Sequence, residues 1–157
     1  MARSTYLYVS YIRTTPEKLW KALTDGEFMR QYWFGMRGDS DFKKGSPWKL
    51  VATDGTVWDA GEILESDPPK RLVIRWAHQN KAELKAEGDS ICTMELEPDQ
   101  GAVKLSITHT VEREPSKLIV AVSGGWPKVI SNLKSLLETG SVALAEPYHT
   151  AATKVGG

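Results

Sequence analysis

The chain has 157 residues, a length that fits one domain and lets folding bury roughly 70% of the surface that an unfolded chain exposes. Its 20 Lys plus Arg balance 20 Asp plus Glu, and a formal net charge of zero argues against a general nucleic-acid binder or a protein drawn to anionic membranes. The single cysteine, Cys92, excludes an internal disulfide framework and a multi-thiolate metal site, and suits a reducing compartment. We therefore expect a cytoplasmic protein that binds no nucleic acid.

Hydropathy also argues against membrane insertion. The longest clean apolar run covers residues 118–122, far short of a membrane span, and residues 2–13 lack the apolar stretch of a signal peptide. The unusual feature is aromatic: six Trp stand against three Phe, although a buried indole N–H needs a hydrogen-bond partner.

The first third of the chain predicts a strand and two short helices. Residues 5–13 are aromatic and β-branched, as in a strand. Thr15 is a candidate N-cap, with Pro16 at the first position of a short amphipathic helix. The segment 24–27 (TDGE) fits a capping box that begins at Thr24 and starts a second helix.

The middle of the chain predicts antiparallel strands separated by turns. Asp54-Gly55 predicts a two-residue hairpin between strands near 47–53 and 56–66. Strands near 70–78 and 102–112 alternate apolar and polar residues, which indicates a sheet covered on one face. The charged segment 79–88 is interpreted as a mobile loop or a strand extension.

The last element is a long amphipathic helix from about Ser116 to Thr139, long enough to cross a sheet. Gly140 is a natural C-terminal cap, and the run 124–127 (GGWP) predicts a kink because proline cannot donate its backbone hydrogen bond. We expect a domain over residues 1–140 and a poorly ordered tail over 141–157. The order of elements describes an α+β helix-grip fold, in which a curved antiparallel sheet wraps the final helix.

Four segments together resemble the family related to the activator of the Hsp90 ATPase, in the START-like superfamily: 15–33, 61–76, 105–110 and 124–140. The resemblance implies the helix-grip fold and a cavity for a small hydrophobic molecule between the sheet and the last helix. It alternatively implies an interaction module for a chaperone or regulator, as in a stress response. Either protein would be a monomer or a homodimer, and no cofactor is implied.

The sequence offers little support for metal or nucleophilic chemistry. The three histidines, His78, His109 and His149, are isolated from one another without metal-ligand spacing, so we expect no metal site. No nucleophile elbow, P-loop or dinucleotide fingerprint occurs. Alternation places His109 on the inward face, either as a neutral core histidine or as the catalytic residue of a cavity enzyme.

Carboxylates in the predicted strands give no acid–base pair. Asp59, Glu62 and Glu95 would be costly on the inward face unless they were paired. We therefore expect them on a solvated face, paired with a residue such as Arg75.

An apolar pocket is typically lined by aromatic and aliphatic groups with a few polar ones. Six residues are predicted to line the cavity: Trp33, Trp76, Met94, His109, Val122 and Trp126. The alternative is that these side chains simply fill the core.

Overall fold

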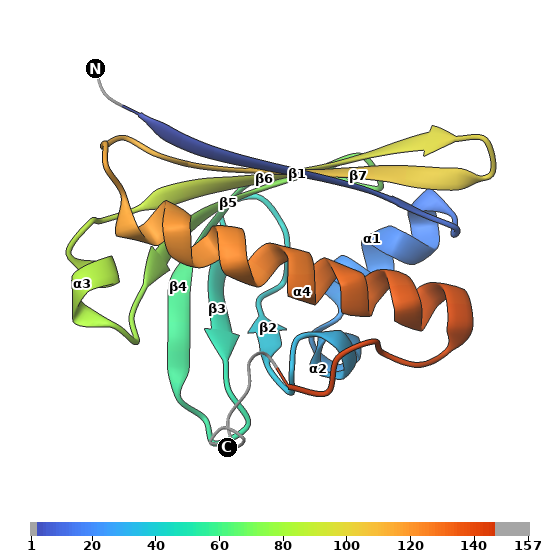
Figure 1. Cartoon of the computed structure of the whole chain (residues 1–157), viewed down its shortest axis with the longest axis horizontal. Helices are drawn as coiled ribbons and strands as arrows, with labels where there is room; N and C mark the ends of the chain where they lie inside the picture. The colour runs from blue at the N-terminus through green and yellow to red at the C-terminus, as the bar shows by residue number, and fades with distance from the viewer. Residues whose placement is uncertain (1–2, 147–157) are drawn as a thin grey trace.

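Seven strands form one antiparallel sheet that curves around a long C-terminal helix (Figure 1). The structure is a computed structural model that describes residues 3–146. The strand order is β1-β7-β6-β5-β4-β3-β2. The elements are β1 (Ser4–Ile12), α1 (Pro16–Thr24), α2 (Gly26–Tyr32), β2 (Arg37–Asp39), β3 (Pro47–Val51), β4 (Val57–Asp67), β5 (Arg71–His78), α3 (Ala82–Lys85), β6 (Ser90–Asp99), β7 (Ala102–Val111) and α4 (Lys117–Thr139). The predicted helix-grip fold is confirmed.

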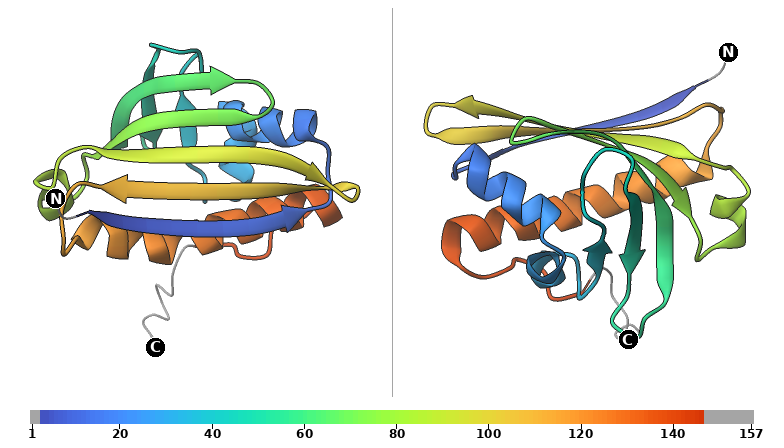
Figure 2. Two further views of the ribbon diagram at one scale, coloured as in Figure 1. Left: turned by 90° about the horizontal axis from the view of Figure 1, so that it is seen from above. Right: turned by 180° about the vertical axis from the view of Figure 1, so that it is seen from behind.

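The core lies between the inward face of the sheet and the helices. Figure 2 shows α4 running beneath the β1 edge of the sheet, with α1 and α2 on the same face of the sheet. The alternation predicted for β7 is present, since Val103, Leu105, Ile107, His109 and Val111 are all buried. Packing of these side chains in a dry interior is the main favourable contribution to folding.

The N-cap of α1 and the C-cap of α4 are those expected, and the N-cap of α4 is Ser116. Thr15 accepts a hydrogen bond from the backbone N–H of Lys18, and Ser116 accepts one from the backbone N–H of Ile119. Gly140 ends α4 in the left-handed region, with φ of 91°.

The capping box predicted for α2 is wrong by one residue. Asp25 is the N-cap, and its Oδ1 accepts hydrogen bonds from the backbone N–H groups of Glu27 and Phe28. Thr24 is still the last residue of α1, where its hydroxyl donates to the carbonyl of Trp20. Because α1 already uses this hydroxyl, the neighbouring carboxylate caps α2 instead.

The hairpin between β3 and β4 is also one residue longer than predicted. The Ala52 N–H donates to the Thr56 carbonyl at 2.8 Å, and the Gly55 N–H donates to the Ala52 carbonyl at 3.0 Å. Three residues therefore lie between Ala52 and Thr56, and Gly55 takes a φ of 89°. A glycine in this position forms the bulge that lets a three-residue loop match the strand twist.

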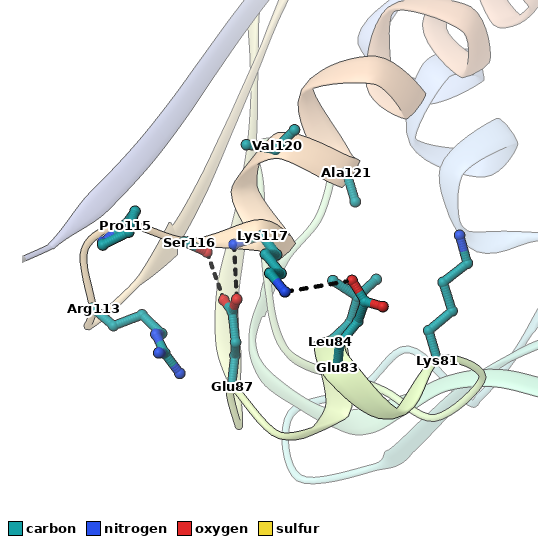
Figure 3. A pocket seen from close by; sticks show the side chains of 10 residues that line it. All are labelled: Lys81, Glu83, Leu84, Glu87, Arg113, Pro115, Ser116, Lys117, Val120 and Ala121. Carbon is teal, nitrogen blue, oxygen red and sulfur yellow. Dashed lines mark hydrogen bonds and ion pairs between the residues drawn. The ribbon is translucent and has the colours of Figure 1, made fainter.

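The segment 79–88 contains the short helix α3, so its interpretation as a loop or strand extension is wrong. Leu84 of α3 is buried in the core. Glu87 then accepts hydrogen bonds from the Ser116 hydroxyl and the Lys117 backbone N–H, both at 2.7 Å (Figure 3). These contacts join the segment to the start of α4.

Helix α4 is continuous through residues 124–127, even though Pro127 lacks a backbone N–H (Figure 1). After α4, the Asn132 side chain accepts a hydrogen bond from the Leu144 N–H at 2.6 Å and donates one to the Leu144 carbonyl at 2.8 Å. These bonds join Leu144, in the segment predicted as a tail, to the helix. The remainder, 147–157 with His149, lies outside the described residues.

Candidate functional site

A cleft of about 150 Å³ lies between α4 and the strands β4 and β5. Its lining residues come from three elements, β4, β5 and α4, and from the residue that caps α2: Trp33, Asp59, Trp76, His78, Ala121, Val122, Gly125, Trp126 and Val129. The rings of Trp33, Trp76 and Trp126 pack against one another, with centroids 5.5–6.1 Å apart. Four of the six predicted cavity residues therefore line one cleft.

The cleft continues into a wider groove of about 380 Å³, with which it shares Trp33, Ala121, Gly125 and Val129. The groove is completed by Phe34, Met36, Leu50, Trp58, Gly124 and Lys128. A Cβ atom added to Gly124 or Gly125 would meet no heavy atom within 4 Å, so these glycines border open space. Two glycines in the middle of a helix are each unfavourable by about 1 kcal/mol relative to alanine. Because they have no side chain, they leave the space beside this part of α4 open.

His109 lies beneath the cleft floor and is not among its lining residues. The Trp126 indole N–H donates to His109 Nδ1 at 3.2 Å, so Nδ1 must be unprotonated. The other ring nitrogen, Nε2, therefore carries the proton and donates it to Ser90 Oγ at 2.7 Å. The Ser90 hydroxyl donates in turn to the Trp76 carbonyl at 2.8 Å. The chain of hydrogen bonds is complete, and neither ring nitrogen faces a ligand.

The electrostatics of His109 agree with a neutral ring. Burial lowers the pKa of His109 to about 3, with a smaller contribution from His78 in the same direction. A second proton on the ring would also place an N–H against the Trp126 indole donor. The arrangement therefore favours the neutral core histidine over the catalytic one.

Met94 lies elsewhere in the core. It pairs with Leu72 in the β5–β6 register, whereas Trp76 pairs with Ser90, four residues along β6. Because a strand rises about 3.3 Å per residue, Met94 is more than 10 Å along the sheet from the cleft floor. Met94 therefore does not line the cleft, in contrast to the prediction.

Asp59 is the functional candidate that sequence reasoning missed. The expected pairs do form on the solvated face for Glu62 with Arg75 and for Glu95 with Arg71, at 3.2 and 2.6 Å. Asp59 instead faces inward and is 5% exposed, which overturns the expectation for this residue. Asp59 and buried Ile63 are four residues apart on β4, so their side chains point to the same face of the sheet. This spacing was available in the sequence.

Asp59 and His78 lie opposite each other in the β4–β5 register, with 3.6 Å between Asp59 Oδ1 and His78 Nε2. Burial raises the pKa of Asp59 to about 7, an effect that the nearby Trp76 side chain partly offsets. Burial also lowers the pKa of His78, partly offset by Glu87. The two groups thus resist the charged forms that would make an ion pair at neutral pH.

Four buried side-chain polar atoms in residues 3–146 have no hydrogen-bond partner: Trp33 Nε1, Asp59 Oδ1, Trp76 Nε1 and His78 Nδ1. All four residues line the same cleft. Buried polar atoms are nearly always paired, so such a cluster points to a site where a bound molecule or water completes the pairing.

A larger cavity of about 520 Å³ lies at the start of α4, between α3 and the loop after β7 (Figure 3). The polar groups at the helix start already have partners, because the Glu87 carboxylate accepts hydrogen bonds from Ser116 and from the Lys117 backbone. Lys117 also approaches Glu83, with Nζ and Oε2 4.0 Å apart. The aromatic cleft is therefore the stronger candidate.

Two other kinds of site find no support in the part of the chain that the structure describes. No three His, Cys, Asp or Glu side chains there are arranged to hold a metal ion. Among the same residues, no helix is both long enough and apolar enough to cross a membrane.

Comparison with known families matches residues 13–138 to the family described as "Activator of Hsp90 ATPase homolog 1-like protein". The match begins directly after β1 and ends in the last turn of α4, and it includes every residue that lines the cleft. A search of curated proteins finds no match.

Solved structures share the fold at low sequence identity. Protein MLL2253 from Mesorhizobium loti is 24% identical, with a TM-score of 0.76 over 88% of this chain and 100% of its own. The Aha1 dimer from Colwellia psychrerythraea is 19% identical, with a TM-score of 0.72 over 87% of this chain and 98% of its own. PFC0360w from Plasmodium falciparum, described as an HSP90 activator, is 21% identical, with a TM-score of 0.68 over 85% and 95%.

Proposed function

The chain belongs to the Activator of Hsp90 ATPase homolog 1-like protein family, and we propose that it binds a small, mainly apolar molecule in the cleft between α4 and the strands β4 and β5. The observation that carries this proposal is the cluster of four unpartnered buried polar atoms in a cleft walled by three tryptophans. An apolar ligand with a few polar atoms complements both features.

The energetics favour an occupied cleft. A buried donor or acceptor without a partner costs roughly 1–3 kcal/mol, which a polar atom of a ligand would recover in part. Burial of apolar ligand surface contributes a further 25 cal/mol or so per Å². A space of about 150 Å³ suits one six-membered ring, and the adjoining groove has room for a substituent.

A variant that blocks the cleft tests this proposal. Gly125→Leu places a side chain where the backbone now borders open space, and Ser131→Leu adds the same side chain to an exposed position of α4. Both proteins and the wild type are screened with small aromatic and aliphatic compounds by tryptophan fluorescence and thermal shift. A compound at 100 times its Kd stabilises the folded state by about 2.7 kcal/mol. We expect hits for the wild type and Ser131→Leu that Gly125→Leu loses. Hits shared by all three proteins, or none, would contradict the proposal.

A second candidate function is contact with an Hsp90-type chaperone in the cytoplasm. The family match and the likeness to an HSP90 activator support it. ATP turnover by the host's Hsp90-type chaperone is measured with and without this protein. Stimulation that survives Gly125→Leu would assign the chaperone contact to another surface, and unchanged turnover without a complex would remove this candidate.

A further inference from the structure

We propose that the ligand of this cleft carries a cationic amine that forms an ion pair with Asp59. The inference rests on the proposed function and adds the chemical class of the ligand. It starts from the contrast between Asp59 and the other carboxylates of the central strands.

Asp59 lacks the countercharge that its neighbours have. Glu62 contacts Arg75, and both Glu65 and Glu95 contact Arg71, at distances of 2.6–3.2 Å. These carboxylates are partly exposed, whereas Asp59 is buried and has no Lys or Arg partner among residues 3–146; only the Trp76 side chain favours its ionised form. A buried carboxylate without a paired cation is unfavourable, so a cation supplied by the ligand would be strongly favoured there.

Among residues 3–146, no Lys, Arg, Glu or second Asp lines the cleft around Asp59. The nearest titratable group is His78, whose imidazole is held neutral by burial. The α4 residues that face Asp59 across the cleft are uncharged, and Lys128 lines only the outer groove. Lys81 and Glu87 act on His78 from the segment around α3, with opposite effects. An amine in the inner cleft would thus meet a single carboxylate.

The remaining walls also suit a cation. Trp33, Trp76 and Trp126 give the cleft aromatic faces, which attract ammonium groups, most strongly when water is excluded. An anionic ligand would face like-charge repulsion from ionised Asp59. A hydroxyl or carbonyl oxygen on the same ligand would give the indole N–H of Trp33 an acceptor, while the Trp76 side chain lies beside Asp59 itself.

Three probes of similar size separate the ligand classes: benzylamine, benzyl alcohol and benzoate. Their binding is measured by isothermal titration calorimetry at pH 7.5. We expect benzylamine to bind at least tenfold more tightly than benzyl alcohol, and benzoate to bind least. Asp59→Asn should remove the preference for the amine and retain binding of the alcohol. Glu62→Gln is the matched control, since this carboxylate faces the solvated side beside Arg75, and it should keep the preference.

Proton release gives a second readout. Below about pH 7 the free Asp59 carboxyl is protonated, whereas the ion pair requires the carboxylate, and benzylamine is already protonated in solution. Binding near pH 6 should therefore release close to one proton per amine, seen as a dependence of the binding enthalpy on the buffer. The affinity should fall as the pH falls below 7. Benzyl alcohol should release none.

The outcomes distinguish the two proposals. Binding of benzyl alcohol without a preference for benzylamine would overturn the amine assignment and leave the cleft a ligand site. A preference that persists in Asp59→Asn would overturn the role of Asp59. Failure of all three probes to bind would count against the proposed function itself.

Discussion

A fully buried histidine, His109, and a half-buried one, His78, show how differently two regions of this interior are built. His109 donates to Ser90, accepts from Trp126 and leaves no polar atom unpaired. His78 lies beside Asp59 at 3.6 Å, and each retains an unpartnered atom. The polar side-chain atoms of His109, Ser90 and Trp126 are all paired by hydrogen bonds. Around His78, some buried polar atoms have no partner unless a molecule binds in the cleft.

Within one continuous interior, the region around His109 serves stability and the region around His78 serves the proposed ligand binding. Trp126 belongs to both regions, because its indole N–H is used by His109 while its ring lines the cleft. The hydrogen bond therefore holds a cleft wall in one orientation. The fixed region positions the rings, and the incomplete region remains available to a ligand.

The largest expected effect comes from removing each histidine in turn. His109→Ala leaves a cavity and removes the hydrogen-bond acceptor of the Trp126 N–H, so it should lower the free energy of unfolding by about 3 kcal/mol. His78→Ala removes a group without hydrogen bonds to its Nδ1 and should cost less than about 1 kcal/mol. Urea unfolding measures both. Equal losses would erase the contrast between the two regions.

The pH dependence of stability should also differ between the two regions. Asp59 has a raised pKa of about 7, so its contribution to the free energy of unfolding is present at low pH and is lost as the pH rises from about 4 to 7. His109 has a lowered pKa of about 3, so its contribution is present above pH 6.5 and is lost as the pH falls toward 3. The two effects oppose each other between pH 4 and 6.5.

Asp59→Asn should remove one of these opposing effects. Its free energy of unfolding should then rise with pH more steeply than that of the wild type, by up to about 1.4 kcal/mol per pH unit. Urea titrations at pH 4.5, 5.5 and 6.5 give the two slopes. Parallel curves for variant and wild type would mean that Asp59 ionises normally in the folded protein.

Two matched tryptophan substitutions sharpen the same comparison. Trp126→Phe removes the donor to His109 and should cost about 1–2 kcal/mol beyond the loss of ring size. Trp33→Phe removes an indole N–H that has no partner, so this contribution should be absent. Thermal and urea unfolding of both variants report the difference. A larger loss for Trp33→Phe would show that its N–H is paired in solution.

The smallest expected change in stability comes from a substitution in α4, beside the cleft. Gly124→Ala adds a methyl group into open space and removes backbone freedom from the unfolded chain, which should raise the free energy of unfolding by about 0.5–1 kcal/mol. The melting temperature should rise accordingly. A fall would indicate that the helix needs glycine at this position for a reason other than space.

Much of the fold could be predicted because periodicity determines it. Alternation on β7 placed five inward residues, and the helical spacing in α4 placed Val122 and Trp126 on the sheet. The errors arose where neighbouring residues compete for one role. Thr24 and Asp25 could each cap α2, and only the end of α1 decides between them.

The site was predicted only in part because it depends on strand register. Periodicity brought Trp33, Trp76 and Trp126 to the interior, but it does not say which β4 residue lies opposite His78. The pairing of Asp59 with His78 is set by the register of β4 against β5, which shifts at a bulge after Ile63. Local turn and bulge geometry of this kind is weakly encoded in a single sequence.

Residue-resolved NMR of the indole N–H groups tests the central claim most directly. Each of the six tryptophans gives one side-chain resonance, which Trp→Phe variants assign. Titration with benzylamine should shift the Trp33 and Trp76 resonances in a saturable way and leave that of Trp20, on α1, in place. Resonances of Trp33 and Trp76 that stay fixed at a high probe concentration, while the protein remains folded, would contradict a ligand site in this cleft.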